Sequence, residues 1–285
     1  MFKSIIDTYN IGVLSANHKN VESIDASIQE LVFKNKLLLN VTYNKGPSIL
    51  IDVRCNINFI YYLDMLLKLL NVVDIQDDNS YYKFTINGKH LLNNNYNILT
   101  NLNIHNIVID ESFTEENIPT IDIQNDFNYK SSNNLVTIDK YDIKNKYRLD
   151  FFESWRQANY IMFKHSKNIL KLSVKDSNDL WSTFFLSNDF NSFSKVISKN
   201  NLINLNDKIP VRAVFKTSEK NVILRQPMVE NKDTLENLIE DKLKIENPYK
   251  ILIQGFLIQN LRFKLIQLYE NFHSPDGFLY IVIII

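Results

Sequence analysis

The C-terminal part of the chain alternates apolar and polar positions in a way that predicts a β-hairpin followed by a helix. Residues 209–215 alternate apolar with polar or small side chains, a polar break follows, and residues 222–225 resume the apolar pattern. Asp233 can cap the next helix, with Glu236 three places further on in a variant of the capping box. The expected helix has one apolar stripe, formed by Leu235, Leu238, Ile239 and Leu243.

Two more strands are expected after this helix. The first is 251–253, which ends at a Gln254-Gly255 turn, and a leucine-rich connection then runs through Tyr269 to a second turn at 274–277. The final apolar run, 278–283, is the last expected strand. This order resembles ubiquitin, whose fold is a β-grasp sheet wrapped on one helix. Because the sequence ends in two isoleucines instead of a diglycine, we expect this region to have the fold without acting as a ubiquitin-like modifier.

The first 113 residues repeat this pattern more loosely. Strands are expected at 11–16 and 37–43, and a strand with a turn at 84–89. Residues 107–109 would be the closing strand. The helix between these strands is expected to begin at a capping Asn58, with one apolar face formed by Phe59, Leu63, Leu66 and Leu70. We therefore predict a first ubiquitin-like domain within residues 1–113, after an N-terminal helix and strand region.

The middle of the chain has helical periodicity. Residues 114–146 are polar, acidic and poor in aromatic side chains, which favours an exposed linker. A helix is predicted from the spacing of Phe151, Trp155, Ala158 and Met162. Ser173 and Asp176 then give a capping signal before an aromatic-rich stretch. The predicted fold is α+β, with a helix-rich domain at 147–206 between the first ubiquitin-like domain and a second one at 207–285.

Composition narrows the classes of function. The 285-residue chain has 32 lysines and arginines against 32 aspartates and glutamates, so it has no net charge that would attract nucleic acid. We expect neither a secretory signal nor a membrane span, because acidic and polar residues interrupt each apolar run. The single cysteine, Cys55, excludes a disulfide framework within the chain. The five histidines lack the spacing of a zinc site, so we expect no metal and no cofactor.

Candidate catalytic groups are few. Cys55 follows Arg54 and has no histidine at a recognisable spacing, so a core cysteine is the favoured interpretation. The alternative, a cysteine hydrolase acting on ubiquitin-like substrates, would require a reactive thiol at Cys55. The sequence therefore predicts a protein without catalytic residues of its own.

Lys167 is the residue that best fits a chemical role. It is expected where the first helix of the middle domain ends, with Lys164 and Lys171 close by. Lysines at a helix C-terminus commonly do no more than interact with the helix dipole. An exposed lysine amine is also the nucleophile that attacks a thioester when an isopeptide bond forms. Both interpretations stay open on the sequence pattern alone.

Short strings in two regions resemble the autophagy protein 5 family. In the helical region these are Trp155-Arg156-Gln157, Ile161-Met162, Ser166-Lys167, Leu172-Ser173-Val174, Leu180-Trp181, Asn188-Asp189-Phe190 and Phe193. In the C-terminal region they are Arg225-Gln226-Pro227, Gln254-Gly255 and the run from Ser274 to Ile281. The first 113 residues are similar mainly in layout: Tyr96 is in place, but Asn97 and Ile98 replace the family's proline and glycine.

The resemblance implies a non-catalytic scaffold of autophagy. Lys167 would be the conjugation acceptor for the ubiquitin-like autophagy protein 12, which in some lineages docks non-covalently instead. A helix of autophagy protein 16 would lie in a groove lined by all three modules. The assembly would act like an E3 and promote transfer of autophagy protein 8 from its conjugating enzyme to phosphatidylethanolamine, in the cytoplasm and at autophagosome precursor membranes. The alternative is an interaction module with ubiquitin-like folds and no conjugation role.

Overall fold

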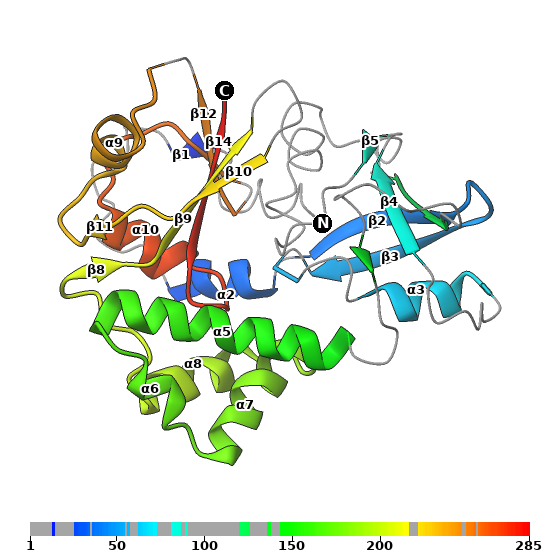
Figure 1. Cartoon of the computed structure of the whole chain (residues 1–285), viewed down its shortest axis with the longest axis horizontal. Coiled ribbons are helices and arrows are strands. Elements are labelled where there is room, and N and C mark those ends of the chain that lie inside the picture. Colours follow the sequence, from blue (N-terminus) through cyan, green and yellow to red (C-terminus); the bar gives the residue numbers. More distant parts are fainter. Residues whose placement is uncertain are drawn as a thin grey trace. The chain divides into compact units, whose positions relative to one another are not determined.

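The chain forms two compact units in a computed structural model (Figure 1). The C-terminal unit combines residues from 1–34 with 148–285, and the N-terminal unit consists of residues from 35–147. The structure describes residues 13–14, 26–34, 36–54, 56–57, 62–72, 81–86, 89–90, 120–125, 136–137, 143–216, 222–246, 249–254 and 256–285. Each unit is described by itself below.

The sheet of the C-terminal unit has the order β1-β13-β12-β14-β9-β10. Its strands are β1 (Val13–Leu14), β9 (Val211–Lys216), β10 (Val222–Arg225), β12 (Lys250–Ile253), β13 (Phe256–Ile258) and β14 (Leu279–Ile284). The hairpin β9–β10 is antiparallel, and β14 lies parallel to β9 over six paired residues. In the β-grasp fold, the last strand lies at the centre of the sheet, parallel to the first strand of the hairpin. Strand β14 has this position beside β9, so the predicted second ubiquitin-like fold is confirmed. A separate two-stranded sheet pairs β8 (Lys208–Ile209) with β11 (Val229–Glu230).

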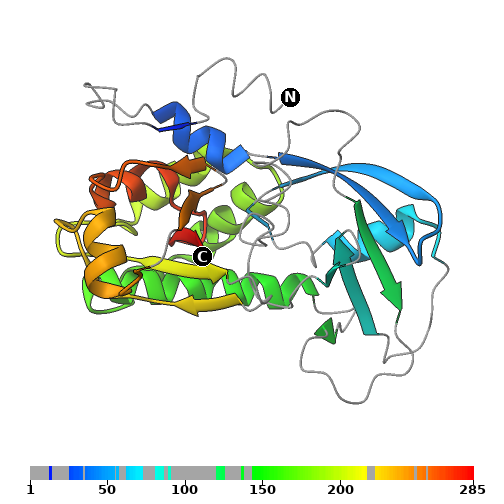
Figure 2. The same cartoon turned by 90° about the horizontal axis from the view of Figure 1, so that it is seen from above.

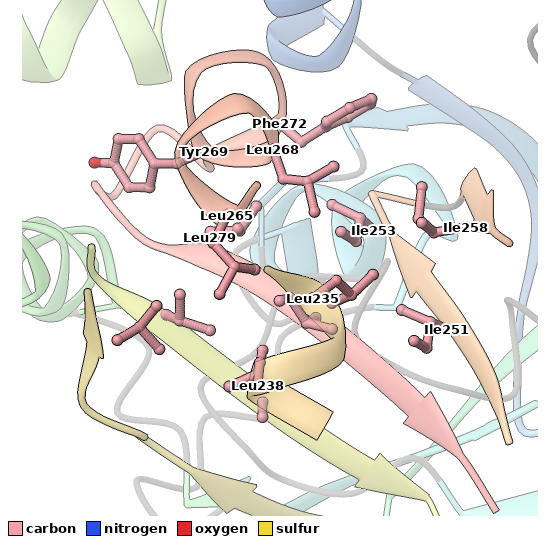
Figure 3. Packing of buried hydrophobic residues seen from close by; sticks show 14 of the residues in the cluster. Leu235, Leu238, Ile251, Ile253, Ile258, Leu265, Leu268, Tyr269, Phe272 and Leu279 are labelled. Atoms are coloured by element: carbon pink, nitrogen blue, oxygen red, sulfur yellow. The ribbon is translucent and has the colours of Figure 1, made fainter. Parts of the chain in front are cut away.

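The core of this sheet is covered by two short helical segments. The first is α9 (Leu235–Asn237), which continues as a single π-helical turn, η4 (Leu238–Lys242). All four residues of the predicted apolar stripe are buried. The second is α10 (Leu265–Phe272), where the sequence indicated only a leucine-rich connection. Figure 3 shows Leu265, Leu268 and Phe272 of α10 packed with residues of α9 and of the strands in one cluster.

The cap of α9 is displaced by one residue from its predicted position. Thr234, and not Asp233, is the N-cap, because its hydroxyl accepts a hydrogen bond from the backbone N–H of Asn237. Asp233 has another role, since its carboxylate accepts from the Glu230 backbone N–H and lies 2.8 Å from the Lys242 amine. Burial alone would raise the pKa of Asp233, but these two partners outweigh burial and lower it.

The helical bundle consists of α5 (Ile143–Phe163), α6 (Lys167–Leu170), α7 (Val174–Phe185) and α8 (Phe190–Lys199). The four residues that predicted its first helix are all buried in α5. The predicted cap is also confirmed, since the Ser173 hydroxyl accepts a hydrogen bond from the Asp176 backbone N–H. Asp189 caps α8 in the same way by accepting from Ser192. Side-chain oxygens at these positions satisfy backbone N–H groups that have no partner within the helix.

Residues near the N-terminus pack with the C-terminal unit. The helix α2 (Ala26–Lys34) contacts α10 and α8 (Figure 2). Its Phe33 is 3% exposed and its ring centroid lies 4.9 Å from that of Phe193 and 5.5 Å from that of Phe190. The strand β1 extends the sheet by pairing with β13 in parallel. This part of the chain, predicted as a helix and strand region before the first ubiquitin-like domain, therefore belongs to the C-terminal unit.

The N-terminal unit has a second β-grasp sheet, in the order β3-β2-β6-β4-β5 with β7 paired to β4. Its elements are β2 (Lys36–Tyr43), β3 (Ser48–Arg54), α3 (Leu63–Leu69), β4 (Tyr81–Ile86), β5 (Lys89–His90), β6 (Thr120–Asn125) and β7 (Val136–Thr137). β2 and β3 form the hairpin, and β6 lies parallel to β2 at the centre of the sheet. The Asp122 carboxylate of β6 accepts hydrogen bonds from the Thr42 hydroxyl and the Lys45 backbone N–H, which ties β6 to β2 and to the turn after it.

The position of β6 differs from what the sequence predicted for the linker and for the closing strand. Residues 120–125 were expected in an exposed linker, yet they form the closing strand of the sheet and Asp122 is buried. The closing strand was expected at 107–109, which lies outside the described residues, as do Cys55, Asn58 and Phe59. Within the part that the structure describes, no helix is long and apolar enough to cross a membrane.

The packing of α2 leads to a testable prediction. Phe33→Ala should destabilise the C-terminal unit by about 3–5 kcal/mol, because it removes a buried ring from an aromatic cluster. Hydrogen exchange followed by mass spectrometry should show faster exchange in α8 and α10 and unchanged exchange in β2 and β3. The control Lys34→Ala, on the exposed side of α2, should change stability by less than about 0.5 kcal/mol. Faster exchange confined to β2 and β3 would contradict this placement of α2.

Candidate conjugation site

Lys167 lies at the first residue of α6, and not at the end of the preceding helix as the sequence predicted. The helix α5 ends at Phe163, and Lys164 has a left-handed backbone with φ of 62°. Its backbone N–H still donates to the Tyr160 carbonyl at 2.9 Å, which closes the last turn of α5. The chain then starts a new helical turn at Ser166, so Lys167 lies in a corner between two helices.

The backbone of this corner is fixed while the Lys167 side chain is exposed. Ile169, two residues on, is buried with 6% exposure. The Asn168 side chain donates to the Asn201 carbonyl at 2.9 Å, which ties α6 to the end of α8. The Lys167 backbone N–H donates to Nδ1 of His165 at 3.3 Å. The geometry therefore holds the Cα of Lys167 in place and leaves its amine open to solvent.

The surroundings of Lys167 combine positive charge with exposed apolar side chains. Lys171 is the C-cap of the same short helix, and the Lys164 amine lies 3.0 Å from the Asp207 carboxylate in an exposed ion pair. Leu170 and Val174 are 65% and 81% exposed, far more than an aliphatic side chain in a core. The exposed amine therefore lies on a stretch of chain that also exposes aliphatic side chains.

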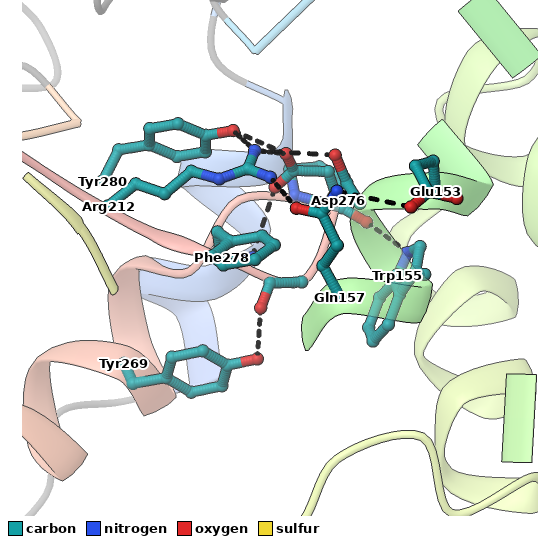
Figure 4. A network of polar contacts seen from close by, with 11 residues as sticks. Glu153, Trp155, Gln157, Arg212, Tyr269, Asp276, Phe278 and Tyr280 are labelled. Carbon is teal, nitrogen blue, oxygen red and sulfur yellow. Dashed lines mark hydrogen bonds and ion pairs between the residues drawn. The ribbon is translucent and has the colours of Figure 1, made fainter. Parts of the chain in front are cut away.

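A contact between α5 and the turn before β14 fixes the helical bundle to the sheet (Figure 4). The Trp155 indole is fully buried and donates to the Pro275 carbonyl at 2.9 Å. Gly277 has φ of 87°, and a Cβ on this residue would lie 3.0 Å from the Trp155 ring. Glycine is therefore required here both by its backbone conformation and by the close approach of the indole. The buried Tyr269 hydroxyl donates to the Gly277 carbonyl at 2.8 Å and holds the other side of the turn.

Arg212 of β9 is at the centre of this contact. Its guanidinium carbon lies 3.7 Å from the centroid of the Phe278 ring, a cation–π arrangement. It donates to the Gln157 side chain of α5 at 3.0 Å and to the Tyr280 hydroxyl at 2.6 Å. The Tyr280 hydroxyl in turn donates to the Asp276 carboxylate at 2.7 Å, and burial holds the pKa of Tyr280 well above its usual value. This network links α5, β9 and β14 through groups with defined donor and acceptor roles.

The sequence analysis predicted a site at Lys167, which stays a prediction, and it missed this network. Arg212 was recognised only as a polar position in an alternating strand, and Trp155 as an apolar position of a helix and as part of a string that resembles the family. The Trp155 indole donates to the Pro275 carbonyl, 120 positions away in the sequence, so no local pattern predicts this contact. Of the five histidines, His165 lies beside Lys167 and His273 follows α10. Among the described residues, no three His, Cys, Asp or Glu side chains form a group that could hold a metal ion.

Two family models match the chain. Residues 147–200 match "Autophagy protein ATG5, alpha-helical bundle region", and residues 208–283 match "Autophagy protein ATG5, UblB domain". The two matches cover the helical bundle with Lys167 and the sheet that contains Arg212. Their boundaries agree with the division between α8 and β8.

Relatives from two Kluyveromyces species are also named as autophagy protein 5. Autophagy-related protein 5 of Kluyveromyces marxianus is 30% identical over 129 residues, which is 45% of this chain and 46% of the relative. Autophagy protein 5 of Kluyveromyces lactis is 31% identical over 132 residues, 45% of this chain and 47% of the relative. The aligned part thus spans about half the length of these curated relatives.

A solved structure shows the same fold over a longer range. The crystal structure of Kluyveromyces marxianus Atg5 matches with a TM-score of 0.71, covering 90% of this chain and 98% of that one at 21% sequence identity. At this identity the match is evidence for the fold alone.

The fold defines a class of protein that combines two ubiquitin-like domains with a helical bundle. The two matched models and the named relatives support assignment of the helical bundle and the second ubiquitin-like domain to the autophagy protein 5 family.

The network around Arg212 can be tested by substitution. Arg212→Met should lower the free energy of unfolding by about 3 kcal/mol, because it leaves Asp276 in a largely buried position without its cation. Urea denaturation of the full chain measures this. The matched control is Arg225→Met on the exposed strand β10, where the guanidinium lies 5.1 Å from the Phe215 ring, and it should cost less than about 1 kcal/mol. Equal losses for the two variants would contradict the role assigned to Arg212.

Proposed function

We propose that this chain is a non-catalytic scaffold of autophagy that joins the ubiquitin-like autophagy protein 12 at Lys167, by an isopeptide bond or by non-covalent docking. It also binds a helix of autophagy protein 16. The assembly acts like an E3 and promotes transfer of autophagy protein 8 from its conjugating enzyme to phosphatidylethanolamine. We place this activity in the cytoplasm, with peripheral recruitment to autophagosome precursor membranes.

The observation that carries the proposal is the position of Lys167. It lies inside the matched helical-bundle region, on a backbone tied down by Asn168 and Ile169, with its side chain exposed. In the covalent form, the neutral Nζ attacks the carbonyl carbon of a thioester that links the modifier to its conjugating enzyme. The C–N bond forms, the C–S bond breaks, the enzyme's thiol leaves and the amine gives up a proton. A fixed backbone reduces the conformational freedom that this step must restrict.

The scaffold role is supported by how the chain is built. Both sheets have the β-grasp order, and the bundle that carries Lys167 is held to the second sheet by Trp155 and Arg212. Contacts of this kind set the position of one docked protein relative to another. We propose that the reacting cysteine belongs to the conjugating enzyme, while this chain supplies position and surface.

The covalent form is tested by a denaturing gel of the protein isolated from its own cells. Wild type should migrate with the added mass of one ubiquitin-like modifier, and Lys167→Arg should remove that step, because a guanidinium is not a nucleophile at neutral pH. The matched control Lys171→Arg, at the other end of the same short helix, should keep it. Loss of the step in Lys171→Arg alone would contradict the choice of Lys167.

A second experiment separates the scaffold from an interaction module without a conjugation role. If no covalent step is seen, non-covalent docking predicts that the modifier co-purifies under native conditions and that both variants retain it. Deletion of the chain should reduce lipidation of autophagy protein 8 at least tenfold, and restoring the chain should recover it. Intact lipidation without the chain would overturn the proposal.

A further inference from the structure

A pocket of about 380 Å³ lies in the C-terminal unit between α2, α8 and the residue that follows α10. Phe190, Phe193 and Ile197 of α8 give it an apolar wall, and Ile203 adds to that wall. An engineered apolar cavity of about 150 Å³ holds benzene. The volume here is therefore sufficient for an aromatic ring with a polar substituent, or for two fused rings. It falls within the usual range of small-ligand pockets.

The polar groups of the pocket are neutral. Ser194 and Ser198 lie one turn apart on α8, and Asn201 lies just beyond the end of that helix. In the part of the chain that the structure describes, neither serine hydroxyl has a hydrogen-bond partner in the protein. The described residues that line the pocket include no carboxylate, ammonium or guanidinium group. Charge complementarity therefore favours an uncharged ligand.

His273 gives the pocket a specific hydrogen-bond acceptor. Its Nδ1 lies 2.9 Å from the Tyr269 carbonyl oxygen, which can only accept, and 3.4 Å from the Gln29 side-chain nitrogen. We assign the proton to Nδ1 on the shorter of these two contacts. The imidazole also stacks on the Tyr269 ring at 4.8 Å, which fixes its orientation. Burial lowers the pKa of His273 and keeps the ring neutral. The second ring nitrogen, Nε2, is then an acceptor on a residue that lines the pocket.

We propose that this pocket binds a neutral aromatic group that carries an N–H or O–H donor, of the indole or phenol class. The ring lies against Phe190 and Phe193, and the donor bonds to Nε2 of His273. The hydroxyls of Ser194 and Ser198 form hydrogen bonds with further polar atoms of the ligand. This site is on different elements from Lys167 and does not depend on the conjugation role proposed above.

Titration of the full chain with indole tests the proposal, with binding followed by isothermal titration calorimetry. Indole should bind saturably, and 1-methylindole, which has the same shape but no donor, should bind about tenfold more weakly because Nε2 loses its partner. Comparison with N-acetyl-tryptophanamide distinguishes the two sources of this chemistry. Tighter binding of the amide indicates a tryptophan side chain of a partner, and binding of indole alone indicates a free small molecule.

Two variants locate the binding. Ser194→Phe fills the pocket and should weaken indole binding at least tenfold, while Ser187→Phe, on an exposed residue after α7, should leave it unchanged. Circular dichroism checks that both variants are folded. The comparison of indole with 1-methylindole on the wild type needs no variant, so it remains decisive if Ser194→Phe does not fold. Absence of saturable indole binding, equal affinity for the two indoles, or equal affinity in Ser194→Phe would overturn the proposal.

Discussion

The contact between α5 and the turn before β14 is the constraint on which the rest of the C-terminal unit depends. The Trp155 indole packs against Gly277, which has a left-handed backbone, and Arg212 joins α5 to the sheet beside it. Without this contact the helical bundle and the β-grasp sheet would each have an uncovered face. With it, the short helix that bears Lys167 has a fixed relation to the sheet, because α6 is tied to α8 and α5 is tied to β9 and β14.

In the same unit, the buried core and the exposed corner at Lys167 are formed by different elements. Its central strand β14 is buried along five of its six residues, so its sequence is a continuous apolar run instead of an alternating one. The corner at Lys167 has one buried anchor, Ile169, and exposed side chains on both sides of it. A protein that positions others needs both properties: a core that does not deform and a surface group that a partner can reach.

Much of the fold could be predicted from local patterns. Apolar stripes with a period near 3.6 found α5 and the helix over the second sheet, and alternation found the hairpin β9–β10. The cap at Thr234 was misplaced by one residue because Asp233 and Thr234 are both good capping residues, and only tertiary contacts with Glu230 and Lys242 decide between them.

Long-range packing could not be predicted in this way. The strand β6 has polar residues at alternate positions and lies in a polar stretch, so its composition indicated a linker although it pairs at the centre of a sheet. The helix α2 packs against residues more than 150 positions away in sequence, and a single chain gives no signal for such a contact. Lys167 was singled out from its place near an expected helix end, and its proposed role came from a resemblance of sequence strings. Its actual place at the start of α6 follows from the left-handed residue Lys164.

We propose that this chain works as the platform on which a ubiquitin-like modifier is held. Native mass spectrometry of the complex isolated from its own cells tests it most directly, since covalent and non-covalent pairing both survive the measurement. We expect a species heavier than the 33.5 kDa chain by one ubiquitin-like protein, with or without further partners. Detection of the 33.5 kDa chain alone, or only with partners unrelated to ubiquitin-like conjugation, would contradict it.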